Sequence, residues 1–182
     1  MRYFLRRSIP PFTRVLLVES GRRDLFEDLL PGLYRVHPNM TADLITCYGG
    51  LPQNFQSDRG GVYRVTDYPN SRARKKLYSL LAANHYTVLG IICSDEPIMA
   101  KWKWVLAARL PGKVFILNEN GDYFWFDRGH LSNVRHFILF RAGLTGAGAV
   151  RTLARLALFP FTLLYLILYA ATIHFRRKLR TL

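Results

Sequence analysis

At 182 residues, the chain is long enough for one domain and a short accessory segment, but hardly for two independent cores. Half of its residues are hydrophobic, which excludes a disordered or low-complexity protein. The formal net charge is +14, yet residues 129–182 hold eight of the 26 Lys and Arg residues and none of the 12 Asp and Glu residues. Because these basic residues flank an apolar segment, anionic headgroups of a lipid bilayer are their expected partner, and we expect no nucleic acid.

The N-terminal segment, residues 1–12, is basic but has no apolar core of signal-peptide length. The two cysteines, Cys47 and Cys93, each close a short β-like run, and neither belongs to a CxxC pair or has a histidine at ligand spacing. We therefore expect no metal site, two reduced buried thiols, and a domain that stays in the cytoplasm.

The first half of the chain alternates apolar runs with loops. Residues 14–19 form a short apolar run that is ended by Ser20-Gly21 and predicts a buried strand. Apolar residues then recur at helical spacing over residues 25–33, where Pro31-Gly32 predicts an irregular helix end. Residues 42–47 predict a second strand, residues 48–61 a loop, and residues 62–66 a third strand near a sheet edge.

The second half continues this alternation. Ser71 is expected to cap a basic helix that runs to Asn84. A central strand over residues 88–93, a helix from Pro97 to Leu110 and a fifth strand over residues 113–118 follow. This order predicts an α/β fold, a Rossmann-like and mostly parallel five-stranded sheet flanked by helices. In the helix predicted from Pro97 to Leu110, Lys101 and Lys103 are expected on a solvated face.

Residues 156–173 carry no charge and, as a helix, span about 27 Å, close to one hydrocarbon core. They predict a C-terminal transmembrane or membrane-embedded helix; the alternative is a buried helix of a soluble protein. Four basic residues lie on each side, so the charge rule leaves open a single span, which we favour, or a re-entrant segment bent at Pro160. The expected organisation is a basic segment (1–12), an α/β domain (13–130), a basic connecting helix (131–152), a membrane helix (153–175) and a basic tail (176–182).

Polar clusters follow the predicted parallel strands, at the edge where open α/β sheets bind ligands. A carboxylate at this edge can deprotonate a sugar or lipid hydroxyl, and an arginine near a helix N-terminus can hold a phosphate. The candidate catalytic residues are Asp24, Asp95, Glu96 and Glu119. The candidate substrate-binding residues are Ser20, Arg22, Arg23, Asn118, Asn120, Asp122, Tyr123 and Trp125.

Each group also has a purely structural interpretation. Asp95 and Glu96 suit the positive end of the helix that follows them. Asn120-Gly121 is a common turn pair, and Trp125 is equally suited to a core. No G-x-G-x-x-G loop follows the first strand, so we expect no dinucleotide cofactor, and no other cofactor is indicated.

Three local patterns are shared with one known family. They are the apolar run 15–18, Asp24 followed by Leu29-Leu30-Pro31, and the basic helix 72–81 that leads through Tyr86 into the strand at Val88. Over roughly residues 13–120, this pattern resembles the N-terminal, acceptor-side half of GT-B glycosyltransferases of the ADP-heptose:lipopolysaccharide heptosyltransferase type. The resemblance implies a Rossmann-like fold.

The family usually has Gly-Asp ahead of an apolar helix closed by Leu-Pro, and this aspartate is taken as the catalytic base. Here Arg23 replaces the glycine, and Asp24 stands one residue out of step with Leu30-Pro31. In the family a second Rossmann domain binds the sugar nucleotide, whereas this sequence continues into its apolar segment.

The leading hypothesis is a membrane-anchored, glycosyltransferase-like domain on the cytoplasmic side of a bacterial inner (plasma) membrane, acting in envelope glycan or lipopolysaccharide assembly. It would be incomplete as a transferase alone, and would bind a lipid-linked saccharide or pair with a partner glycosyltransferase. Two alternatives stay open: a non-catalytic scaffold that recruits glycan-assembly enzymes, and a small stand-alone enzyme that uses the strand-end carboxylates.

Overall fold

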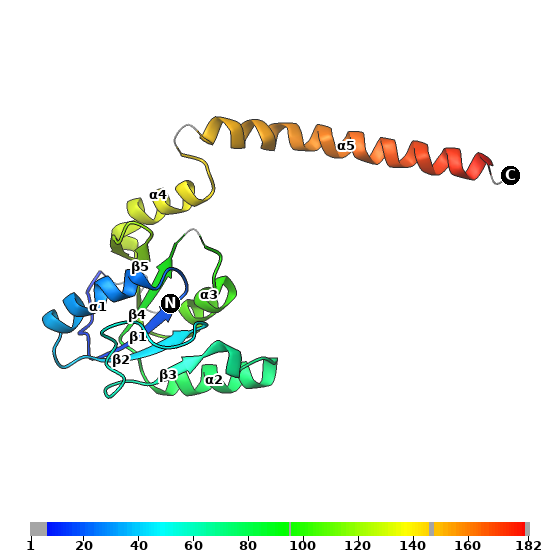
Figure 1. Ribbon diagram of the computed structural model, residues 1–182. Coiled ribbons are helices and arrows are strands. Elements are labelled where there is room, and N and C mark those ends of the chain that lie inside the picture. The colour runs from blue at the N-terminus through cyan, green and yellow to red at the C-terminus, as the bar shows by residue number, and fades with distance from the viewer. Residues whose placement is uncertain (1–6, 95, 146–147, 181–182) are drawn as a thin grey trace. The chain divides into compact units, whose positions relative to one another are not determined.

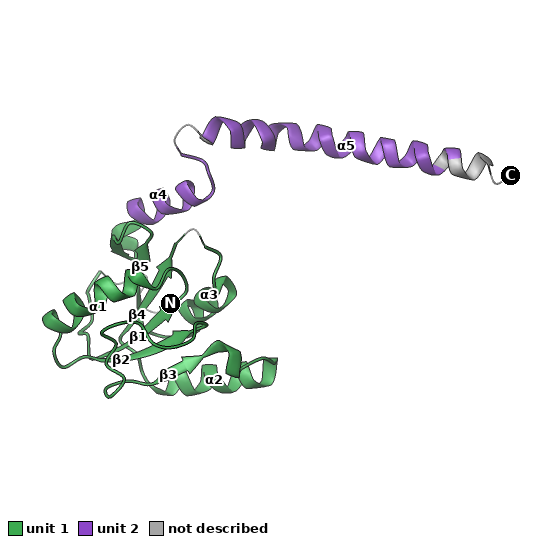
Figure 2. Cartoon of the chain, in the orientation of Figure 1, with its two compact units in different colours: residues 1–131 green, residues 132–182 purple. Residues whose placement is uncertain are grey.

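The chain forms two compact units, Met1–Leu131 and Ser132–Leu182 (Figure 2). The computed structural model describes residues 7–94, 96–145 and 148–180. The first unit is an α/β domain, and the second contains most of one short helix and all of one long helix (Figure 1).

The α/β unit is built on a six-stranded sheet with the order β3-β2-β1-β4-β5-β6. Its strands are β1 (Arg14–Glu19), β2 (Thr41–Thr46), β3 (Val62–Arg64), β4 (Val88–Cys93), β5 (Lys113–Asn118) and β6 (Tyr123–Trp125). Strands β1 to β5 pair in parallel, and β6 pairs antiparallel with β5. The prediction of five strands is therefore wrong by one, because the three residues of β6 are too few to show an alternating pattern.

Three α-helices connect the parallel strands: α1 (Asp24–Val36), α2 (Ser71–Ala83) and α3 (Ala100–Arg109). Helix α1 packs on the face that carries Val15, Leu17 and Leu44. Side chains alternate along a strand, so the fully buried Leu16 and Val18 belong to the opposite face, which α2 and α3 cover. Between β2 and β3 the chain has a loop instead of a crossover helix, and two short 3-10 helices, η1 (Val65–Asp67) and η2 (Arg128–His130), complete the unit.

The helix ends differ from the predictions in three places. Helix α1 continues through Pro31 to Val36 instead of ending near the proline. The N-cap of α2 is Asn70, whose side chain accepts a hydrogen bond from the Ala73 N–H at 2.8 Å, so the predicted Ser71 cap is wrong. Helix α3 begins at Ala100 rather than Pro97.

Asp43 is one of the charged side chains that lie buried in the α/β unit. Asp43, in β2, is 3% exposed and accepts hydrogen bonds from the Gly61 N–H at 2.7 Å and from the Tyr86 hydroxyl. Arg14 adds an ion pair at 3.5 Å. The pKa of Tyr86 lies far above its usual value, mainly because its hydroxyl is buried and, to a smaller extent, because it faces the Asp43 carboxylate. Asp43 therefore joins the middle of β2 to the residues just before β3 and just before β4.

The second unit contains α4 (Leu131–Arg141), which starts at the unit boundary, and α5 (Gly148–Arg180). The predicted single connecting helix over residues 131–152 is thus divided between α4 and the first turn of α5. Within α5, the span Ala149–His174 contains an 18-residue stretch with a mean hydropathy of 2.1, and no residue of that stretch is buried. The helix is continuous through Pro160, and it is long and apolar enough to cross a membrane.

Candidate functional site

The parallel strands bring polar residues from separate segments to the carboxyl edge of the sheet. Strand β1 lies between β2 and β4, so the chain leaves β1 toward β2 and returns later to β4 on its other side. Such a reversal of strand order is the usual ligand-binding position in open α/β sheets. Here the position is formed by residues 19–24 after β1, residues 46–50 after β2 and Ser94 after β4.

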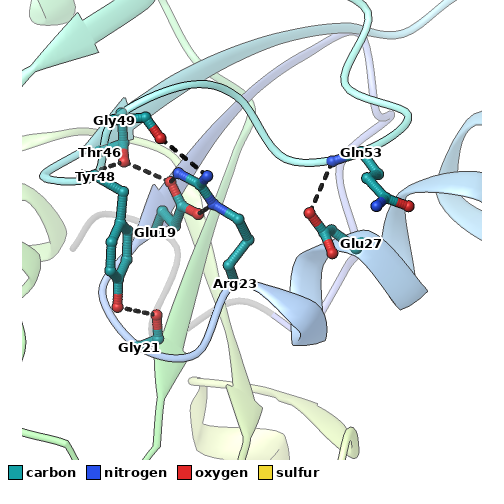
Figure 3. A network of polar contacts seen from close by, with 8 residues as sticks. All are labelled: Glu19, Gly21, Arg23, Glu27, Thr46, Tyr48, Gly49 and Gln53. Atoms are coloured by element: carbon teal, nitrogen blue, oxygen red, sulfur yellow. Dashed lines mark hydrogen bonds and ion pairs between the residues drawn. The ribbon is translucent and has the colours of Figure 1, made fainter.

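A buried ion pair dominates this edge (Figure 3). Glu19 is fully buried, and its Oε1 accepts a hydrogen bond from Arg23 Nε at 2.6 Å. The other carboxylate oxygen accepts from Arg23 Nη2 at 3.4 Å and from the Thr46 hydroxyl. The hydrogen bond to Glu19 raises the pKa of Arg23. Both oxygens of Glu19 are therefore engaged, and its charge is balanced within the protein.

Arg23 also holds the loop after β2 against the turn after β1. Its Nη1 donates to the Gly49 carbonyl at 3.0 Å, and its guanidinium carbon lies 5.1 Å from the centre of the Tyr48 ring. The Tyr48 hydroxyl donates to the Gly21 carbonyl at 2.9 Å, and burial raises the pKa of that hydroxyl. Two loops that are distant in sequence are thus joined around one arginine, as Figure 3 shows.

Asp24, the candidate base, is the first residue of α1 and is ion-paired with Arg22. Both side chains are about half exposed. The hydrogen bond from Arg22 holds the pKa of the Asp24 carboxyl below its usual value. Glu96 is exposed and contributes negative charge near Arg22, while Asp95 lies outside the described residues. The predicted site residues Arg22, Asp24 and Glu96 are therefore neighbours at the surface.

The second group of candidates forms the hairpin between β5 and β6. Asn118 Oδ1 accepts hydrogen bonds from the N–H groups of Asn120, at 3.0 Å, and Asp122, at 2.9 Å. Gly121 takes a φ of +81°, which a glycine adopts without strain. Asn118, Asn120 and Asp122 therefore have a clear turn-forming role, and Glu119 lies partly exposed between them.

The two aromatic candidates on β6 have different environments. Tyr123 is 64% exposed, whereas Trp125 is 9% exposed and packs edge-on against Phe12 and Phe115, with ring centres 5.9 Å apart in each pair. Both line an apolar cavity of about 570 Å³ between α1 and the β5–β6 hairpin. Its volume lies within the range of small-molecule sites, about 300–1,000 Å³. Tyr123 is thus available to a ligand, while Trp125 belongs to the core.

Sequence reasoning missed one buried cation. Lys103 was expected on a solvated face, but it is 6% exposed, and its Nζ lies 3.4 Å from the Ile92 carbonyl. The same carbonyl accepts a 2.7 Å hydrogen bond from the Ser20 hydroxyl. A signal was present in the sequence: Lys103 shares helical spacing with the buried Leu106, Ala107 and Leu110, on the stripe that faces the sheet.

A second buried ion pair lies at the opposite edge of the sheet, where β5 begins. Lys113 Nζ is 2.7 Å from Asp127 Oδ2, and both side chains are 1% exposed. Asp127 Oδ1 lies 2.8 Å from His130 Nδ1, and Lys113 also donates to the Ser8 carbonyl at 3.1 Å. This cluster fastens the N-terminal segment to the end of β6. Within the described ranges, no group of three or more His, Cys, Asp or Glu residues is arranged to hold a metal ion.

No family model, curated protein or solved structure matches the chain. Only the chain's own residues therefore bear on its function.

Proposed function

We propose that the protein is a membrane-anchored, glycosyltransferase-like module that takes part in bacterial envelope glycan or lipopolysaccharide assembly. It binds a lipid-linked saccharide or pairs with a partner glycosyltransferase, and it does not complete a transfer reaction alone. The observation that carries the anchoring is α5, whose apolar stretch is exposed on every side. In water such a helix would leave a large apolar surface uncovered, whereas a bilayer solvates it.

The continuous course of α5 through Pro160 supports a single span over a re-entrant segment. Basic residues at both of its ends suit anionic headgroups. We place the α/β unit on the cytoplasmic side of the inner (plasma) membrane, in keeping with its two cysteines, Cys47 and Cys93, which are both free thiols. Protease added to spheroplasts should leave this unit intact and should digest it in inverted vesicles.

The saccharide proposal is supported by the chemistry of the α/β unit. Hydroxyl, carboxylate and guanidinium groups gather at the carboxyl edge, and these are the groups that hydrogen-bond sugars. The cavity bordered by Tyr123 is apolar and suits a lipid portion or a sugar ring face. In GT-B enzymes the donor nucleotide is held by a second Rossmann domain, and the described residues form a single such sheet.

The second candidate is a non-catalytic scaffold. It is favoured by one observation: the buried Glu19 is already neutralised by Arg23, and the exposed Asp24 is paired with Arg22. A carboxylate held ionised by an arginine is a weak base, so the edge is better arranged to bind than to abstract a proton.

Two measurements test the proposal. After a high-salt wash, the full chain should remain in the membrane fraction, while a chain ending at Arg141 should be released. Calorimetry on the full chain in a maltoside detergent should show no micromolar binding of sugar nucleotides but should show binding of a lipid-linked saccharide. Release of the full chain by salt alone would contradict the anchor. Micromolar binding of a sugar nucleotide would instead indicate a self-sufficient enzyme, and binding of neither ligand would favour the scaffold.

A further inference from the structure

Lys103 stands out among the charged residues of the α/β unit because its charge is buried without a counter-charge in the described part of the chain. Its ammonium group has three N–H donors, and the one hydrogen bond found for it is the 3.4 Å contact with the Ile92 carbonyl. No carboxylate among the described residues lies within ion-pair distance of it, whereas the buried Lys113 is paired with Asp127 at 2.7 Å. A buried ammonium without an anion is unfavourable, so this position is suited to an anionic ligand.

The surroundings of Lys103 point to the same ligand. The hydroxyl of Ser20 lies on the same Ile92 carbonyl, where β1 and β4 diverge. Ser94, the next residue after β4, is 5% exposed, and its hydroxyl has no hydrogen-bond partner in the described part of the chain. Two buried polar side chains with unused hydrogen-bonding capacity, Lys103 and Ser94, are therefore found at the reversal point of the sheet.

The two helices that start at this edge differ in their first turns. The first turn of α1 carries Asp24 and Glu27, whose negative charges already occupy its positive end. The first turn of α3 carries no acidic residue and has no side-chain cap, and Lys103 lies one turn into this helix. The N–H groups at the start of α3 can therefore donate to an anion without competition from an acidic side chain of the first turn, whereas those of α1 already face Asp24 and Glu27.

We propose that Lys103, with Ser94 and the first turn of α3, forms a binding site for a phosphoryl group at the carboxyl ends of β1 and β4. Phosphate is the group that joins saccharide to lipid in the ligand proposed above, so the identity of the whole ligand rests on that proposed function. The chemistry of the site itself needs only an oxyanion. The exposed Glu96 contributes negative charge at Arg22 and Tyr48, on the neighbouring loops.

The test compares Lys103→Met with Lys101→Met, an exposed lysine of the same helix. Thermal unfolding of the full chain is followed in a maltoside detergent, with inorganic phosphate, pyrophosphate or chloride at equal ionic strength. Phosphate at tenfold excess over its Kd should raise the Tm of the wild type and of K101M by roughly 4 °C. K103M should show no such shift, and without phosphate its Tm should equal or exceed that of the wild type, because an unpaired buried charge has been removed.

Dihexanoyl phosphatidylglycerol below its micellar concentration provides a second arm. A Lys103-dependent shift with this lipid alone assigns the phosphoryl group to a headgroup, and a shift with inorganic phosphate assigns it to a soluble or terminal phosphate. A lower Tm of K103M, with no phosphate effect on the wild type, would overturn the proposal and would indicate that Lys103 is paired within the chain. The variant Asp95→Asn would then test whether Asp95 is that partner. Equal losses in K101M and K103M would overturn it as general charge attraction. Membrane retention of K103M is scored separately, so failure of this site leaves the anchoring testable.

Discussion

Arg23 Nε lies 2.6 Å from the carboxylate of Glu19, a residue at the end of β1 that is completely buried. This ion pair joins the end of β1 to the residue that precedes α1. Arg23 also contacts the loop after β2, where it donates a hydrogen bond to the Gly49 carbonyl. One ion pair therefore fixes the geometry of two of the loops that form the carboxyl edge. Its role is to position backbone, because neither partner is left available for proton transfer.

Replacing Arg23 with alanine should destabilise the α/β unit strongly. Glu19 would stay buried without its counter-charge, which costs about 3–5 kcal/mol in comparable cases. Arg22→Ala is the matched control, because it breaks an exposed pair with Asp24 and should leave the urea midpoint unchanged. The double variant E19Q/R23M should recover much of the loss. Equal midpoints for R23A and R22A would show that the Glu19 pair has no structural importance.

The stability of the α/β unit should fall in acid through Asp127. Burial alone would raise the pKa of its carboxyl, but hydrogen bonds from Lys113 and His130 outweigh burial and hold it below the usual value. Asp127 is thus protonated more readily when unfolded, so its contribution is complete above about pH 4 and is lost as the pH falls through the folded-state pKa. Chemical unfolding measured between neutral pH and pH 3, about one unit below the unfolded value, should show this loss.

Asp127→Asn provides the counterpart of that measurement. It should remove the acid-dependent part contributed by Asp127 and should cost about 3–5 kcal/mol at neutral pH, because the buried Lys113 loses its counter-charge. Asp24→Asn is the control: its carboxyl also has a lowered pKa, but solvent screens the exposed pair. A D127N protein with the wild-type acid profile would contradict the assignment.

Tyr123 and Trp125 should separate binding from folding. Trp125→Ala removes a buried ring that packs on Phe12 and Phe115, and it should cost about 3–5 kcal/mol. Tyr123→Ala removes an exposed ring and should change stability by no more than about 0.5 kcal/mol. Binding of lipid-linked saccharide to Y123A, measured by calorimetry, then reports on the cavity alone. Unchanged affinity would exclude Tyr123 from the ligand site.

Gly21 and Gly32 should respond oppositely to alanine. A Cβ at Gly21 would lie 2.3 Å from the Ser94 hydroxyl oxygen and 2.5 Å from an Ile92 methyl, so Gly21→Ala must displace the turn after β1 and should cost about 1–3 kcal/mol. A Cβ at Gly32, inside α1, would meet nothing within 4 Å. Gly32→Ala should therefore stabilise the protein by roughly 0.5–1 kcal/mol. The two thermal shifts should differ in sign, and the same sign for both would refute the packing at Gly21.

Much of the sheet could be predicted from the sequence, because its central strands are buried on both faces and therefore appear as continuous apolar runs. The apolar runs 14–19, 88–93 and 113–118 coincide with β1, β4 and β5. Strand β6 could not be predicted in this way, because its pairing depends on the turn at Gly121 and not on a hydrophobic pattern of its own. The cap at Asn70 shows the same limit, since Asn70 and Ser71 are equally good capping residues and only the backbone distinguishes them.

The candidate site was predicted less well, and for a physical reason. Strand ends located the edge at which Arg22 pairs with Asp24 and Glu96 adds negative charge nearby. The assumption that charged residues face solvent, however, misplaced Lys103, which shares the buried stripe of α3 with Leu106 and Ala107. The role of Glu19 was equally hidden, because it depends on Arg23 folding back across the turn.

Both outer strands of the sheet, β3 and β6, are only three residues long. A long exposed edge strand offers its free N–H and C=O groups to a neighbouring molecule and so invites aggregation. Here each border offers too little backbone for another copy to extend the sheet. The domain can therefore be held at high local density without polymerising through its strands.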